Sequence, residues 1–504
     1  MLVKTSSSTL YGLSAITIVI EVFLGKGINF FLVGLPDNAV KESHQRIKAA
    51  FKNTNLNFPR REITINMAPA DLKKEGSVFD LPIAVGILGV SNQLPTTELE
   101  KHVFIGELSL DGSIQPCRGI LSRVLQAKSE GFKGIVIPIK NFNQVHLIKG
   151  INIIPVRNLS DVISYFENNC TLPIFPEPKI KDQGKLTNDY SEVQAQHHAK
   201  RAFEIAAAGG HNLILIGPPG AGKSMLAKRF PTILPDLALE EALESTSIHS
   251  LISKEGTTNG LLKKRPYRAP HHTISDVALV GGGSNPKPGE ISMAHNGILF
   301  LDELPEFKRS TLEVLRQPLE NESVQICRSN MSIEFPASFT LIAAMNPCPC
   351  GYYGHPKKSC QCTKKSREKY KSKVSGPLLD RIDLHIQVAP ITFEEIQSSE
   401  PQEKSESIKK RVLNAREIQE RRTRMKATLN AKLSILELKT HCALDEEAHA
   451  LLQNAMEKLD LSARAYHKVL KIARTIADLD SQKDIEKKHI AEAIHYRCLD
   501  RENL

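Results

Sequence analysis

The sequence has no apolar run long enough to cross a membrane. The most apolar N-terminal stretch, from Leu10 to Leu24, is interrupted by Glu21 and its polar neighbours, well short of the roughly 20 residues of a membrane helix. No signal peptide is visible either. Cysteine is scarce: nine in 504 residues is an odd number, which argues for reduced thiols rather than a disulfide framework. We therefore expect a cytoplasmic protein without a membrane partner.

The remaining composition excludes little. Hydrophobic residues make up 41% and charged residues 24% of the chain, which is ordinary for a globular protein. A chain of 504 residues is long enough for about three domains. The formal net charge of +10 favours an anionic partner, although in a chain of this length it indicates nucleic acid only weakly.

A glycine-rich segment after the apolar run 212–216 carries the strongest functional signal. Its members are Gly217, Pro218, Pro219, Gly220, Ala221, Gly222, Lys223 and Ser224. This G-x-x-x-x-G-K-S spacing between a strand and a helix is that of a phosphate-binding loop, whose backbone N–H groups surround phosphate oxygens. Lys223 would contact the β- and γ-phosphates of ATP, and Ser224 would place a hydroxyl on Mg²⁺.

Two further predicted strands end in polar residues. The run 297–301 is followed by Asp302 and Glu303; downstream of a phosphate loop, such a pair indicates a Mg²⁺ carboxylate and a general base, while a solvated turn is the alternative. The run 339–345 ends at Asn346, which fits a sensor that orients water near the γ-phosphate.

Three arginines are candidates for contacts to the γ-phosphate. Arg381 precedes a predicted strand at 384–388 and, in a ring, would reach the nucleotide of the neighbouring subunit. Arg464 opens a predicted C-terminal helix and would act within its own subunit. Arg474, on the same helix, is the alternative.

Four cysteines occur as two close pairs, Cys348 with Cys350 and Cys360 with Cys362. Four thiolates can close a tetrahedron around zinc, with His355 as a substitute ligand, although the C-x-C spacing is tighter than the usual C-x-x-C. Reduced thiols without metal are the alternative.

Basic residues supply the candidates for DNA contact. The lysine-rich segment 357–373 is interleaved with tyrosines that would add stacking surfaces: Tyr352, Tyr353 and Tyr370. The candidates are Arg265, Arg268, Arg328, Lys364, Lys365 and Arg367. A basic helical pattern near 408–424 is read equally well as a solvated face or as a DNA contact.

The N-terminal part resembles the proteolytic domain of Lon-type proteases, in the segments 74–82, 106–112 and 119–125. That domain uses a serine–lysine dyad. Here the nucleophile region reads Val78-Phe79-Asp80, and Leu121 stands at the lysine position, so we expect no peptidase activity although Ser77 and Lys74 are near. The expected domains are 1–170 (α/β, Lon-like, also ribosomal S5 domain 2-like), a linker at 171–190, an α/β/α ATPase core at 191–395 and a helical lid at 405–504.

The phosphate loop, the acidic pair, the sensor and the arginines resemble the AAA+ ATPases, and the inserts at 265–272 and 323–335 resemble their magnesium-chelatase-like branch. The second insert is predicted to be a β-hairpin. The whole chain resembles the ComM (YifB) family of bacterial competence proteins. This resemblance implies a homo-hexamer that uses ATP and Mg²⁺ for branch migration of single- and double-stranded DNA during natural transformation, with recombination proteins as further partners. The alternatives are a chelatase-like remodelling ATPase without DNA and an ATP-dependent protease.

Overall fold

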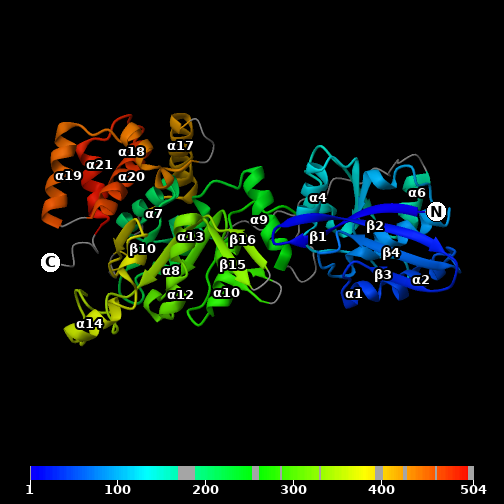
Figure 1. Ribbon diagram of the computed structural model, residues 1–504. Coiled ribbons are helices and arrows are strands. Elements are labelled where there is room, and N and C mark those ends of the chain that lie inside the picture. Colours follow the sequence, from blue (N-terminus) through cyan, green and yellow to red (C-terminus); the bar gives the residue numbers. More distant parts are fainter. Residues whose placement is uncertain are drawn as a thin grey trace. The chain divides into compact units, whose positions relative to one another are not determined.

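The computed structural model describes residues 2–167, 188–252, 260–283, 286–328, 331–391, 395, 401–423, 428–459 and 462–497. The chain forms two compact units (Figure 1). The first comprises Met1–Asp182, Ala238–Leu262 and Ser329–Ile333, and the second comprises Gln183–Leu237, Lys263–Arg328 and Glu334–Leu504. Within the described residues, every helix is too short or too polar to span a bilayer.

A seven-stranded mixed sheet forms the centre of the first unit. Its strands, in spatial order, are β3 (Phe30–Val33), β4 (Glu62–Ala68), β2 (Ser14–Gly25), β1 (Leu2–Tyr11), β5 (His102–Phe104), β8 (Gly134–Pro138) and β9 (Asn152–Val156). Strand β2 runs antiparallel to β1 and β4, and the other neighbours are parallel. Alternate residues of β2, including Ile18, Ile20 and Val22, are fully buried, as in a strand with one face on the core.

The helix α3 (Asp80–Val90) is buried along its whole length and packs against β1 and β2. It is apolar on all sides, which is the pattern of a helix enclosed by its domain. The other helices of this part are α1 (Asn38–Lys41), α2 (Ser43–Asn53), α4 (Ile120–Ser129), α5 (Phe142–Val145) and α6 (Leu159–Glu167), and a short hairpin joins β6 (Glu107–Leu108) to β7 (Ile114–Gln115).

One helix from the predicted ATPase range belongs to the first unit. α9 (Leu239–Ile252) packs against α4, and its Leu243 contacts the apolar core of that unit. Apolar spacing in a sequence predicts that a helix has a buried face, but it does not identify the core that covers the face. The range 191–395 is therefore not a single compact body.

The second unit is built on a five-stranded parallel sheet. The strand order is β11 (Tyr267–Arg268), β14 (Gly297–Leu301), β17 (Phe339–Met345), β10 (Leu213–Ile216) and β18 (Leu384–Gln387). Every neighbouring pair is parallel, so all the carboxyl ends lie at one edge. The fully buried residues of β10, β14 and β17 explain their nearly continuous apolar sequences.

The remaining elements of this part of the chain are helices and two hairpins, of which residues 331–333 of β16 belong to the first unit. The predicted hairpin is present as β15 (Ser323–Arg328) and β16 (Met331–Pro336), and a second one pairs β12 (Gly281–Gly282) with β13 (Lys287–Pro288). The helices are α7 (His197–Gly209), α8 (Lys223–Arg229), α10 (Asp276–Val280), α11 (Glu290–Met293), α12 (Arg309–Glu313), α13 (Arg316–Asn321), α14 (Lys364–Lys371) and α15 (Gly376–Leu379).

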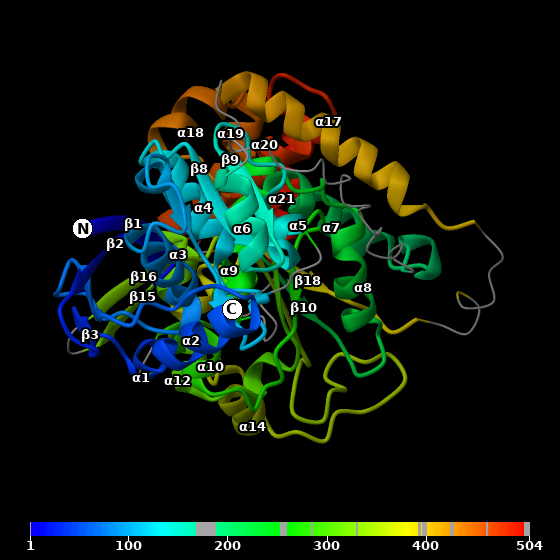
Figure 2. The same cartoon turned by 90° about the vertical axis from the view of Figure 1, so that its right-hand side faces the viewer.

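The C-terminal part is helical, as predicted. It contains the long α17 (Ser405–Thr423), which Figure 2 shows clearly, followed by α18 (Ile435–His441), α19 (Glu446–Leu459), α20 (Ala463–Leu479) and α21 (Lys487–His495). These helices share one apolar core with the parallel sheet, and α17 and α20 both pack on α7. Tyr190, at the end of the predicted linker, is fully buried in the same core, whereas 171–187 lie outside the described residues.

Candidate nucleotide site

The phosphate loop, the acidic pair and the predicted sensor lie at the same edge of the parallel sheet. The loop follows β10, Asp302 and Glu303 follow β14, and Asn346 follows β17. These three strands are neighbours in the order β14-β17-β10. Parallel pairing therefore brings together side chains that are up to 123 residues apart in the sequence, at the edge where open α/β sheets bind ligands.

Glycine is required at three positions of the loop for two different structural reasons. Gly220 and Gly222 have φ values of 79° and 84°, in the left-handed region that glycine adopts without strain. Gly217 is required for space, since a Cβ there would lie 2.3 Å from the carbonyl oxygen of Val388. Helix α8 begins directly after Gly222, so its first N–H groups face the loop and make an anion-binding end.

The side chain of Lys223 folds back onto the phosphate loop. Its Nζ donates to the carbonyl oxygens of Gly217 at 2.7 Å and Pro218 at 3.0 Å, and to Oδ1 of Asn346 at 3.1 Å. Burial lowers the pKa of Lys223, and the nearby carboxylates of Asp302 and Glu303 oppose this shift. The hydrogen bond to Asn346 joins the predicted sensor directly to the phosphate loop.

Ser224 and Asp302 meet across the same edge. The Ser224 hydroxyl donates to Oδ2 of Asp302 at 2.6 Å, and the other carboxylate oxygen accepts the backbone N–H of Glu303 at 2.9 Å. One hydroxyl and one carboxylate are oxygen ligands of the type that Mg²⁺ takes in nucleotide sites, so the donor set fits this ion.

The carboxylate of Glu303 has a partner that the sequence analysis did not assign. Nδ1 of His272 lies 3.5 Å from Oε2 of Glu303, and the Glu303 side chain is 57% exposed. Its backbone adopts φ 52°, a left-handed conformation that directs the side chain out of the strand line. The sequence analysis includes His272 only within the insert at 265–272, because no spacing rule connects it to Glu303.

Arg381 and Arg464 lie together at the opposite edge of the sheet. Both line a cavity of about 610 Å³ that includes Asn212, which directly precedes β10, and Glu320. Arg381 forms an ion pair with Glu320 and donates to the carbonyl oxygen of Pro377 at 2.6 Å. The nearby Arg381, Arg464 and Arg316 lower the pKa of Glu320, with the hydrogen bond from Arg381 as the largest cause.

This location corrects the expectation for Arg464. The phosphate loop follows the carboxyl end of β10, whereas Arg464 lines a cavity at the amino end, so the structure does not bring it to the nucleotide site of its own chain. Arg474 does not replace it. It is 2% exposed, and its guanidinium binds Asp478 and the carbonyl oxygens of Gln482 and Lys483, a structural role.

The four cysteines form one cluster beside the phosphate loop. Their sulfur atoms all lie within 4.8 Å of one another, and the Sγ of Cys348 is 3.3 Å from that of Cys350 and 3.6 Å from that of Cys360. A zinc tetrahedron with Zn–S bonds of about 2.3 Å has sulfur separations of about 3.8 Å, so the set fits this metal. A hydrogen bond from the backbone of Tyr352 lowers the pKa of Cys350 to about 6, whereas burial raises the pKa of Cys348.

The cluster touches the nucleotide site through two backbone positions. Gly351 has φ 82°, and a Cβ there would lie 2.5 Å from Cδ of Pro219 in the phosphate loop. Cys348 follows Asn346 by two residues. His355 is not part of the cluster among the described residues, and its Nδ1 accepts the backbone N–H groups of Lys357 and Lys358.

The lysine-rich segment forms α14, which lies at the periphery of the second unit (Figures 1 and 2). Lys364, Lys365 and Lys369 are exposed on it. Arg367 is less free, because it donates to the carbonyl oxygen of Cys362 at 2.9 Å and stacks on Tyr353, with 4.4 Å between its Cζ and the ring centroid.

The three tyrosines differ in how much of each ring is open for stacking. Tyr370 is 7% exposed, and burial raises its pKa to about 12. Tyr353 is 46% exposed although Arg367 lies over its ring, and Lys358 lies over Tyr352 at 4.8 Å. Tyr352 and Tyr353 thus bind cations of the chain itself, and Tyr353 keeps an exposed surface beside the charges of α14.

Two other candidate DNA residues have structural partners. Arg265 donates to the carbonyl oxygens of Pro235 and Asn296, and Arg268 makes a two-fold ion pair with Glu290 at 2.6 Å. These arginines anchor the insert within the chain, and their assignment as DNA contacts stays a prediction. The side chain of Arg328 lies outside the described residues.

The basic residues of α17 are also paired within the chain. Lys409, Lys410 and Arg421 form ion pairs with carboxylates at 3.1 to 3.3 Å. Arg422 pairs with the buried Asp478, and Arg416 donates to the carbonyl oxygen of Ala207 on α7. These ion pairs are those of a solvated face, the first of the two interpretations given for this helix. Arg424 lies outside the described residues.

The N-terminal unit has no serine–lysine pair at the Lon-like segment. Ser77 donates to Glu107, whereas Lys74 is fully buried and donates to the carbonyl oxygen of Pro69. A desolvated lysine next to a serine could accept the proton of the serine hydroxyl, but here the two side chains have different partners. The expectation that peptidase activity is absent stays a prediction.

Three family descriptions match along the chain. "Subunit ChlI of Mg-chelatase" matches residues 20–141, "Magnesium chelatase, subunit ChlI" matches 189–396, and its C-terminal family matches 402–497. At the N-terminus, the Lon protease of Trichlorobacter lovleyi is 26% identical over 174 residues, which cover 32% of this chain and 20% of that protein.

Full-length relatives are more similar. Competence protein ComM of Haemophilus influenzae is 44% identical over 497 residues, covering 97% of this chain and 96% of that protein. The uncharacterized protein YifB of Escherichia coli is 43% identical over 494 residues, with the same coverage. The chain therefore belongs to the ComM and YifB family of magnesium-chelatase-like AAA+ ATPases, with an N-terminal unit related to Lon proteases.

Proposed function

We propose that this protein is a cytoplasmic ATP-driven motor that moves branch points in DNA and so promotes integration of transforming DNA by homologous recombination. The observation that carries the proposal is its relation, along almost the whole chain, to a protein named for competence. An assembled phosphate loop, acidic pair and sensor at one sheet edge support the ATP hydrolysis that a motor needs.

In this proposal, the residues of the carboxyl edge bind ATP and prepare the attacking water. The N–H groups of the loop and Lys223 hold the phosphates, and Ser224 and Asp302 would hold Mg²⁺, which when bound neutralises developing charge on the phosphates. Glu303 accepts a proton from the attacking water as general base, and Asn346 orients that water. His272, next to Glu303, positions the carboxylate.

The arginines of the opposite edge act on the neighbouring subunit. Arg381 and Arg464 lie away from their own phosphate loop but share one cavity. Head-to-tail interfaces that close generate a ring, and in such a ring each subunit presents one edge of its sheet to the next subunit. Two guanidinium groups supplied in this way would stabilise transition-state charge. We propose a ring on this basis, and a homo-hexamer from the resemblance to the ComM and YifB family.

DNA contacts come from charge more than from stacking. The exposed lysines of α14, which include Lys364 and Lys365, would bind phosphates of single- and double-stranded DNA. The hairpin of β15 and β16 would contact DNA in the ring and move with the nucleotide state. Recombination proteins are further candidate partners.

The cysteine cluster would hold a structural zinc ion. A short loop without its own core gains stability from four metal–thiolate bonds. Because Gly351 abuts Pro219 and Cys348 is close to Asn346, this zinc would fix two parts of the nucleotide site.

A second function is favoured by one observation, the match of all three family descriptions to a magnesium chelatase subunit. In that case the ATPase would remodel a protein partner and would not use DNA. ATP turnover with and without single-stranded and branched DNA separates the two. Stimulation by DNA supports the motor, whereas unchanged turnover in assembled protein would favour the chelatase-like role.

A further inference from the structure

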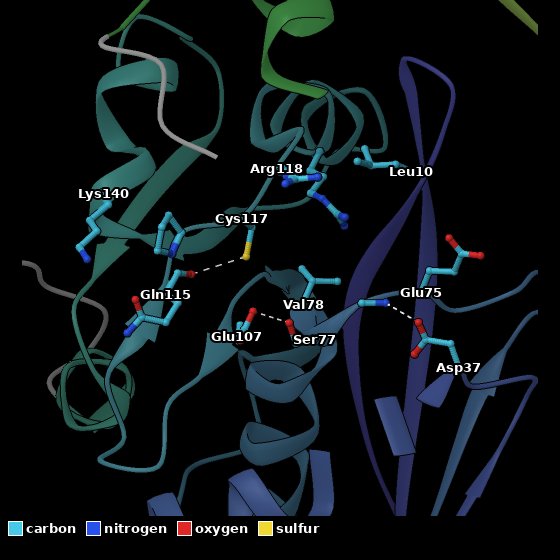
Figure 3. Close-up of a pocket in the computed structure, with 13 residues that line it drawn as sticks. Leu10, Asp37, Glu75, Ser77, Val78, Glu107, Gln115, Cys117, Arg118 and Lys140 are labelled. Atoms are coloured by element: carbon cyan, nitrogen blue, oxygen red, sulfur yellow. Dashed lines mark hydrogen bonds between the residues drawn. The ribbon is translucent and has the colours of Figure 1, made fainter. Parts of the chain in front are cut away.

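The first unit contains a cavity of about 840 Å³ that takes no part in the nucleotide site. It is enclosed by the loops that precede α3 and α4 and by the end of β1 (Figure 3). This volume is in the range of cavities that bind small organic ligands. The Ser77 hydroxyl and the Glu107 carboxylate are hydrogen-bonded in it, but no lysine completes a hydrolytic pair.

A buried arginine lines this cavity without a carboxylate partner. Arg123 is 5% exposed and donates through Nη1 to the carbonyl oxygen and, at 3.2 Å, the hydroxyl of Ser8. Its Nε has no hydrogen-bond partner, and among the described residues it forms no ion pair. Burial lowers its pKa to about 10. A buried cation without an anion is costly, and an anionic ligand would remove that cost.

Two other positive side chains line the cavity, Arg118 and Lys140. In Figure 3, Arg118 lies at the top and Lys140 at the left of the view.

The acidic residues that line the cavity have partners of their own. Asp37 accepts the backbone N–H groups of Val40 at 2.8 Å and Gly76 at 2.9 Å, and Glu75 pairs with Lys73 at 2.7 Å. Glu107 accepts from Ser77, as Figure 3 shows. The lining therefore combines the buried guanidinium of Arg123 with a carboxylate that can accept from a donor.

We propose that this cavity is a binding site for a small organic oxyanion, whose carboxylate or phosphate contacts Arg123, with Arg118 and Lys140 of the same lining as further cations. A hydrogen-bond donor elsewhere on the ligand, such as an amine or amide, contacts Glu107. The site is independent of the ATPase and of DNA, and the proposal stands whether or not the protein is a DNA motor.

Equilibrium dialysis of the full chain tests the proposal. The Lys223→Ala protein is used, since the phosphate loop would otherwise bind the probes, which are labelled orthophosphate and the dipeptide glycyl-glutamate. We expect saturable binding of at least one probe. The double variant Arg118→Ala/Lys140→Ala should weaken it at least about tenfold, because two charged donors are lost. Arg123→Met should weaken it further.

The control removes two cations of the same unit that pair with Glu98 and do not line the cavity, in Lys101→Ala/Lys133→Ala. Its affinity should equal that of the parent. Binding of orthophosphate alone identifies a phosphate ligand, and binding of the dipeptide alone identifies a carboxylate ligand with a donor; either supports the site. The proposal is overturned if neither probe binds saturably, or if Arg118→Ala/Lys140→Ala binds the probe as tightly as the parent.

Discussion

At the scale of single residues, the nucleotide site depends on how the end of each strand directs one side chain. Lys223 contacts three oxygen atoms of the loop and sensor, and Ser224 contacts Asp302. Glu303 stands apart, since its side chain is more than half exposed and its carboxylate lies near His272. The first group of residues thus forms the binding surface, while Glu303 is free to serve in the reaction.

Substitutions should separate these two roles. We expect Lys223→Ala to abolish ATP-dependent activity, because the buried ammonium that holds the phosphates is lost. Glu303→Gln should leave ATP binding intact and lower the turnover number by about 10²-fold or more, because an amide cannot accept the proton. Nucleotide binding by fluorescence and turnover by phosphate release measure the two effects. Retained turnover in either variant would remove the assigned role.

The predictability of these residues follows from their neighbours. Asp302 and Asn346 come directly after apolar runs, and Lys223 ends the glycine-rich loop that follows a third run, so parallel pairing brings all three to one edge of the sheet. The sequence around Arg464 contains no such signal, because the packing of α20 decides which edge of the sheet Arg464 reaches. The partners of Arg265 and Arg268 are set by tertiary contacts, which a sequence of basic residues does not contain.

At the scale of elements, the cysteine loop should be stabilised by metal. We expect about one zinc ion per chain, and loss of it in Cys360→Ser, because three thiolates close the site less well. ATP turnover should fall with it, since Gly351 packs on Pro219. Elemental analysis and turnover are the measurements.

The matched control for the zinc prediction is His355→Ala. His355 lies near the loop but accepts backbone N–H groups and is outside the sulfur cluster, so zinc content should not change. A chain that contains no zinc when purified without chelator, yet hydrolyses ATP normally, would contradict the metal assignment.

Helix α14 should supply part of the DNA affinity. Replacing Lys364, Lys365 and Lys369 by alanine removes three exposed charges, and the slope of log affinity against log salt should fall by about 2 to 3. A salt series of fluorescence anisotropy with single- and double-stranded DNA measures the slope.

The control for the α14 prediction removes the same charge from α17. Lys409, Lys410 and Arg421 are replaced by alanine; each pairs with a carboxylate of its own chain, so the slope should stay that of the parent. Equal slopes for the α14 variant and the parent would show that DNA binds elsewhere.

At the scale of the whole molecule, the arginines predict a site shared between subunits. Lys223→Ala and Arg381→Ala should each be nearly inactive, the latter by about 10²- to 10³-fold in turnover. When the two are mixed, about a quarter of the interfaces join an intact phosphate loop to an intact Arg381, and turnover should recover accordingly. Turnover of the mixture equal to the sum of the separate proteins would exclude action on a neighbour.

The overall architecture was largely predictable. The parallel sheet, the hairpin of β15 and β16 and the C-terminal helices follow from apolar runs and helical spacing. The membership of α9 in the first unit was not predictable, because its apolar residues could have faced either core. Likewise, the sequence order of Arg123, Arg118 and Lys140 gives no sign of the cavity that they share.

The most direct test of the central claim is ATP-dependent branch migration on a synthetic three-strand junction and a Holliday junction. The intact protein should convert both to exchanged products in the presence of ATP and Mg²⁺, and the Lys223→Ala protein should not. Absence of products, and of DNA-stimulated ATP hydrolysis, from protein that assembles and binds ATP would contradict the proposed DNA motor.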